Sequence, residues 1–77
     1  MSASGITGRV VSSTSADGKV TTVFEIPAIT SRQATRRARV NARLKGLDSP
    51  QINEPQMIGQ GDIPGRKIYE VEVVSNR

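Results

Sequence analysis

Histidine, cysteine and tryptophan are absent from this sequence, and phenylalanine and tyrosine occur once each. Without His and Cys, the chain lacks the commonest general base, the strongest side-chain nucleophile and any thiolate metal ligand or disulfide. Only oxygen ligands remain for a metal, and the acidic residues do not have the spacing of a calcium-binding loop. The sequence therefore argues against an enzyme, and we expect no metal or cofactor.

Long apolar runs are also missing. No segment approaches the roughly 20 apolar residues that a membrane-spanning helix requires. The first eight residues, MSASGITG, have neither a basic start nor an apolar stretch, so we expect no secretory signal. These features predict a cytoplasmic protein that does not bind or cross a membrane.

The 77 residues suffice for one small domain, and its large apolar side chains are mostly Val and Ile. A chain of this size buries a low fraction of its surface, and a homodimer would bury more. We expect a single domain over residues 1–77. Its ends, 1–4 and 75–77, are predicted to be disordered, and residues 59–65 are predicted to form a mobile loop.

Two segments near the N-terminus alternate between apolar and polar residues, as half-buried strands do. They cover residues 5–13 and 19–26, and Pro27 breaks the second pattern. Between them, Asp17 and Gly18 tolerate the positive φ angles of a tight turn. The sequence therefore predicts an N-terminal β-hairpin.

A helix is predicted after this hairpin. Thr30 has the chemistry of an N-cap, and Gln33 completes a capping box three residues later. The helix should end near Leu44 or Lys45, because Gly46 can adopt the left-handed conformation that terminates helices.

One side of this helix is suited to packing against a sheet. On a helical wheel, small residues form the inner face, and larger apolar residues are expected to fill one flank. The inner face consists of Ala34, Ala38 and Ala42, and the flank of Val40, Leu44 and Leu47. The small side chains would let the helix backbone approach the sheet closely.

The C-terminal part of the chain completes the sheet. Residues 51–58 form a weak strand pattern that Pro55 would confine to an edge, and Pro64–Gly65 suits a type II turn. Residues 66–74 alternate as a strand. We therefore predict an α+β fold: a two-layer domain in which one helix covers one face of a three- or four-stranded, mainly antiparallel sheet, in the order β-β-α-(β)-β.

The predicted helix carries a concentrated positive charge. The chain has eleven basic and seven acidic residues, for a net charge of +4. Six of the basic residues lie between Arg32 and Lys45, and no acidic residue lies between Thr30 and Leu47, so the remainder of the chain carries a net charge of −2. Four arginines fall within roughly 60° on the helical wheel and extend about 16 Å along the axis. This arginine ridge consists of Arg32, Arg36, Arg39 and Arg43.

The ridge weakens the helix that carries it. Arg32–Arg36 and Arg39–Arg43 are like-charged pairs at i, i+4, and Arg32 lies in the first turn, where the helix dipole disfavours a cation. An amphipathic helix needs a polar outer face, but that need does not explain the absence of acidic partners. The pattern favours a non-catalytic module that binds the backbone of DNA or RNA through the ridge.

Specific base recognition is not indicated. Gln33 and Asn41 could contact base edges but lie off the ridge, and no aromatic residue interleaves with the arginines to stack on bases. Phe24 and Tyr69 are expected in the core. The alternative is a protein-interaction or assembly module. It would present the ridge to an acidic protein or pair strands at the Pro55 edge.

Overall fold

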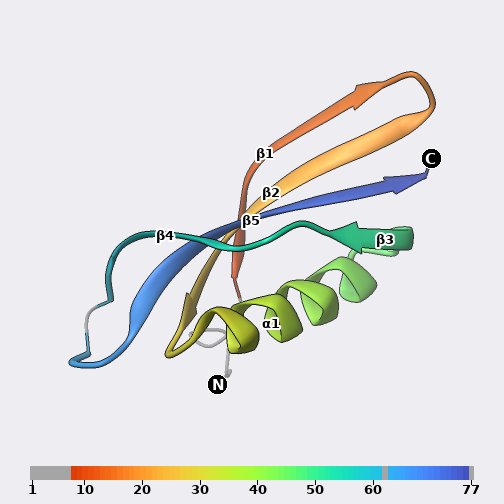
Figure 1. The fold of residues 1–77 in the computed structure, drawn as a ribbon. Helices are drawn as coiled ribbons and strands as arrows, with labels where there is room; N and C mark the ends of the chain where they lie inside the picture. Colours follow the sequence, from red (N-terminus) through yellow and green to blue (C-terminus); the bar gives the residue numbers. More distant parts are fainter. Residues whose placement is uncertain (1–7, 62, 77) are drawn as a thin grey trace.

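The computed structural model describes residues 8–61 and 63–76. The chain folds into two layers, an antiparallel sheet and one helix that lies across a single face of it (Figure 1). The elements in chain order are β1 (Arg9–Ala16), β2 (Lys19–Ala28), α1 (Ser31–Leu44), β3 (Asp48–Ile52), β4 (Gln56–Gln60) and β5 (Lys67–Asn76). The predicted α+β class is confirmed. The predicted β-β-α-(β)-β order holds except that two strands, β3 and β4, replace the single edge strand, which gives β-β-α-β-β-β.

The sheet has five strands, where the sequence predicted three or four. Its order is β1-β2-β5-β3, and β4 also pairs with β5. The weak strand predicted over residues 51–58 is divided at residues 53–55: β3 follows the C-terminal half of β5 and β4 follows its N-terminal half. The expected edge position is confirmed, because among the described strands β3 and β4 pair only with β5. Pro55, which cannot donate a hydrogen bond to a ladder, lies at the break between them.

The N-terminal hairpin is closed as predicted. Asp17 and Gly18 have φ angles of 55° and 76°, and the residues on either side of them are paired. Pro27 does not end β2, which continues to Ala28. The described pairing with β1 begins at Glu25, so Pro27 lies beyond that ladder and pairs only with Ile68 of β5.

Both ends of α1 are fixed by local hydrogen bonds. Thr30 Oγ1 accepts from the backbone N–H of Gln33 at 3.2 Å, and the Gln33 side chain accepts from the N–H of Ile29 at 2.8 Å. The second bond reaches one residue further back than a capping box requires. At the other end, Gly46 has φ 75°, and Leu47 N–H donates to the carbonyl of Ala42 at 3.0 Å, as in a Schellman motif.

The core lies between α1 and the two central strands. Its large, fully buried side chains come from β2 and β5, and Tyr69 is 7% exposed. The helix contributes only small residues to it. The large side chains are Phe24, Ile26, Val71 and Val73, and the helical residues are Ala34, Ala38 and Ala42. The predicted core positions of Phe24 and Tyr69 and the predicted alanine face are confirmed.

The predicted apolar flank of the helix does not form. Val40 is 48% exposed and Leu44 is 74% exposed, whereas Leu47, beyond the helix, is partly buried against the core. The helix is rotated so that Asn41, which is 8% exposed, faces inward beside the alanines. This rotation turns the Val40–Leu44 side towards solvent.

Two predicted irregular segments contain regular structure. Residues 59 and 60 belong to β4, and the turn that follows has the predicted type II form, with Gly65 at φ 85° and an Arg66 N–H to Ile63 carbonyl bond of 3.0 Å. Residues 75 and 76, expected in a disordered tail, are part of β5, and Ser75 is buried. The predicted disorder at residues 1–4 and at residue 77 falls outside the described residues.

The close approach of α1 to the sheet gives a stability prediction. Ala38 is fully buried, so Ala38→Leu should force the helix away from the sheet and lower the free energy of unfolding by about 1–3 kcal/mol. Val40→Leu, two residues away on the exposed side, should change it by less than about 0.5 kcal/mol. Urea denaturation of both variants measures the difference, and equal stabilities would contradict the packing described above.

Candidate nucleic-acid interface

The arginine ridge lies on one uninterrupted helix. Arg32, Arg36, Arg39 and Arg43 all fall within α1 and all four are exposed. The four residues start from one side of the helix, because the buried alanines hold its other side against the sheet. The structure therefore brings the four predicted residues together on one surface.

The ridge guanidinium groups do not form ion pairs within the described part of the chain. Across residues 8–61 and 63–76, the one ion pair joins Arg9 Nε to Glu25 Oε1 at 3.1 Å, on the sheet. No carboxylate of these residues neutralises the ridge through a direct contact, so its charge is presented to solvent.

Arg37 has a different role from its neighbours. It is half-buried, and its Nη1 donates to the backbone carbonyl of Pro27 at 2.7 Å. This hydrogen bond ties Arg37 to the end of β2. Arg37 therefore anchors the helix to the sheet and is not part of the arginine ridge.

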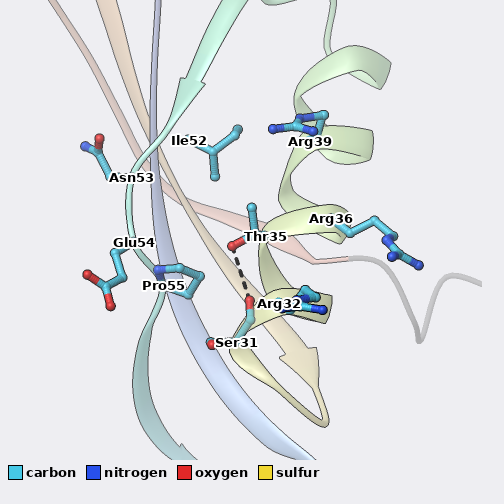
Figure 2. A pocket seen from close by; sticks show the side chains of 9 residues that line it. All are labelled: Ser31, Arg32, Thr35, Arg36, Arg39, Ile52, Asn53, Glu54 and Pro55. Atoms are coloured by element: carbon cyan, nitrogen blue, oxygen red, sulfur yellow. Dashed lines mark hydrogen bonds between the residues drawn. The ribbon is translucent and has the colours of Figure 1, made fainter.

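A hollow runs along one side of the ridge, between α1 and the segment that joins β3 to β4. It has a volume of about 450 Å³. Figure 2 shows Arg39 directed towards the strand side of the hollow and Arg36 directed away from it. The lining residues are Ser31, Arg32, Thr35, Arg36, Arg39, Ile52, Asn53, Glu54 and Pro55.

The hollow has an apolar and hydroxyl lining beneath its arginines. The side chain of Ile52 lies on the helix side of its strand, whereas those of Asn53 and Glu54 point away from the helix (Figure 2). Thr35 Oγ1 donates to the carbonyl of Ser31 at 3.2 Å, within the helix. The carboxylate of Glu54 therefore does not lie over the ridge.

A second hollow continues beside the C-terminal half of the helix. It has a volume of about 350 Å³ and shares Arg39 with the first. It is lined by Arg39, Arg43, Gly46, Leu47, Asp48 and Pro50. Each arginine of the ridge thus borders at least one hollow between the helix and the β3–β4 edge.

The opposite face of the sheet is acidic. Glu25 of β2 lies directly across from Glu70 of β5, and Glu72 lies two residues along the same face. Two of these three carboxylates have a polar partner: Arg9 contacts Glu25, and Asn53 Nδ2 donates to Glu72 Oε1 at 2.8 Å. The two layers of the fold therefore carry opposite charge on their outer surfaces.

The two residues considered for base recognition both make hydrogen bonds within the chain. The side-chain oxygen of Gln33 accepts from Ile29 N–H, and Asn41 is buried with its Nδ2 donating to the carbonyl of Arg37 at 2.7 Å. No aromatic residue lines either hollow beside the ridge. What sequence reasoning missed is the strand side of the hollow, including Ile52 and Asn53, because its position depends on how residues 48–60 cross the sheet edge.

Comparisons with known proteins do not assign the chain to a group: no family model, curated protein or solved structure matches it. The described residues contain no helix that is long and apolar enough to span a bilayer. They also contain no group of three acidic side chains placed to hold a metal ion.

The ridge predicts that the same charge reversal changes the stability of the protein differently at the two ends of the helix. Arg32→Glu removes a like-charged pair, adds a favourable Glu–Arg pair at i, i+4 and places an anion in a first turn that has none, so it should stabilise the protein by about 1 kcal/mol. Arg43→Glu makes the same charge change in the last turn, where the dipole favours a cation, and should stabilise it less or destabilise it. Thermal unfolding at low salt compares the two, and equal shifts would contradict this account.

Proposed function

We propose that this protein is a non-catalytic module that binds the backbone of nucleic acid through the arginine ridge. The observation that supports this function best is that four exposed arginines share one helix face and have no ion-pair partner among the described residues. Phosphate groups are the matching ligand, because a planar guanidinium group can donate to two phosphate oxygens at once.

The source of affinity would be electrostatic. A surface that neutralises adjacent phosphates releases their condensed counterions, and this release supplies most of the non-specific binding to nucleic acid. The arginines are spaced along about 16 Å of helix, which suits a row of phosphates better than a single small anion. The ligand is therefore a polymer in this proposal.

Weak sequence preference follows from the same surface. Base-specific contacts need free hydrogen-bonding or aromatic side chains near the base edges. Here Gln33 is engaged at the helix start and Asn41 is buried, and neither hollow contains an aromatic residue. Binding would thus depend on phosphates and on the shape of the backbone.

The acidic sheet face supports one orientation of the complex. Glu25, Glu70 and Glu72 lie on the layer opposite to the helix. A polyanion is attracted by the helix and repelled by the sheet, so it would meet the helix layer. An acidic protein would be recognised by the same layer, which is the alternative partner for this ridge.

The test is the salt dependence of binding for a double variant. Arg36→Gln/Arg39→Gln removes two phosphate contacts, so the slope of log K against log salt concentration should fall by about 1.8 for a duplex or about 1.4 for a single strand. Fluorescence anisotropy with both probes, over a range of salt concentrations, measures the slope.

A matched variant controls for the loss of net charge. Lys19→Gln also removes a positive charge, but Lys19 lies on the face of the sheet that the helix does not cover, so its slope should stay at the wild-type value. Equal slope changes in the two variants would contradict a localised ridge site. Absence of salt-dependent binding of the wild type to either probe would reject the function, and binding to an acidic protein alone would favour the alternative partner.

A further inference from the structure

One edge of the sheet is open. β1 pairs with β2 on one side, and no strand within residues 8–61 and 63–76 pairs with its other side. Every residue of β1 is exposed, including Val10 at 38% and Val11 at 52%. The helix does not cover this strand, since α1 packs against β2, β3 and β5 (Figure 1).

The other edge of the sheet is protected against pairing. β3 and β4 are short, and each has an irregular register against β5. Pro50 lies within β3, and Pro55 lies between the two strands. Short strands, bulges and prolines are the usual devices that prevent an edge from pairing with another chain. The edge near Pro55, which the sequence suggested as an assembly surface, is therefore poorly suited to strand pairing.

The β1 edge has few of these devices. One register irregularity occurs between Val10 and Ser12, and the ladder is regular from Ser12 to Ala16. Neither a proline nor a charged residue occurs between Val10 and Ala16. Such an edge presents unpaired N–H and C=O groups that a second strand can satisfy.

The charges at the two ends of β1 indicate which strand fits. Arg9 begins the strand, and Asp17 follows its last residue. An antiparallel partner with the same sequence places its Asp17 end beside Arg9 and its Arg9 end beside Asp17. The Arg9 side chain is 77% exposed although it contacts Glu25, so it is open to a further contact. Parallel pairing of two copies would instead bring like charges together.

We propose that β1 pairs antiparallel with β1 of a second copy of this chain, so that the two sheets become one continuous sheet. Main-chain hydrogen bonds would supply the affinity, as in other cases of strand addition at a sheet edge. The pairing would also cover part of Val10 and Val11, which a 77-residue domain otherwise leaves exposed.

This pairing has a consequence for nucleic-acid binding by the arginine ridge. That consequence, unlike the pairing itself, rests on the proposed function. Antiparallel edge pairing relates the copies by a two-fold axis perpendicular to the sheet, so each helix layer lies on the same face of the joined sheet. Both arginine ridges would then face one side. A long polyanion could engage both, with a gain in affinity from bivalent attachment.

Single cysteine substitutions test the pairing, because the natural chain contains no cysteine. Ser12→Cys, Ser13→Cys and Thr14→Cys place a thiol at successive positions of the β1 edge. A residue on the two-fold axis faces itself at a Cα separation of about 4.5–5.5 Å, within the range of a disulfide. We expect one position to form a covalent dimer at least about tenfold faster than its neighbours under mild oxidation. Gln51→Cys, on the β3 edge, is the matched control and should react slowly.

Charged substitutions give a second, reversible measurement. At the position that cross-links fastest, Lys in both copies or Glu in both copies places like charges opposite each other and should shift the protein from dimer to monomer in sedimentation experiments. An equimolar mixture of the Lys and Glu variants should recover the dimer. Since β1 is exposed, NMR spectra of the remaining residues should show an unchanged fold.

The outcomes separate this proposal from the proposed function. Uniform cross-linking at all positions, or a wild type that sediments as a monomer at every concentration, would overturn the β1 pairing whatever the protein binds. A dimer that persists in both charged variants would place the interface elsewhere. A confirmed β1 dimer without salt-dependent nucleic-acid binding would leave the pairing intact and reject only the function of the ridge.

Discussion

The close contact between three alanines and the sheet determines how the rest of the molecule is arranged. Ala34, Ala38 and Ala42 are fully buried against side chains of β2 and β5. Because these small residues fix the inward side of α1, they also fix the direction of the arginines on its other side. The same contact limits the size of the core. The helix contributes only alanine methyl groups to the apolar core, while Val40 and Leu44 lie in solvent, so the domain has few large side chains to stabilise it.

The charge distribution departs from what stability alone would favour. The ridge places arginines at i, i+4 on the helix, and the sheet places Glu25 opposite Glu70 on neighbouring strands. Each arrangement brings like charges together and weakens its own element. Local rules of this kind are most often broken at functional surfaces, where a partner supplies the missing countercharge. Under the proposed function, the phosphates of nucleic acid would supply that countercharge for the arginine ridge.

The sequence predicts best those features that depend on residues close together in the chain. Asp17–Gly18 closes the hairpin, Thr30 and Gly46 bound the helix, and alternation gives β5 its inner face, because each depends on contacts within a few positions. The arginine ridge was predictable because it lies on one helix. The division of the edge strand at Pro55, the Arg37 bond to Pro27 and the strand side of the hollow depend on contacts between distant segments. Helical periodicity alone also placed Val40 and Leu44 on a packed flank, because it does not say in which rotation the helix lies on the sheet.

Separation of charge between the two layers affects how the molecule approaches other molecules before any contact is made. Arginines occupy the outside of the helix layer and glutamates the outside of the sheet layer, so the molecule has a positive and a negative side. In the electric field of a charged surface, such a molecule experiences a torque that turns its oppositely charged side towards that surface. The rotational search that normally slows the docking of two specific patches is thereby shortened, and arrival in the productive orientation becomes more frequent. Added salt would remove this advantage within a distance of about 10 Å at 0.1 M ionic strength, even where the final contacts are unchanged.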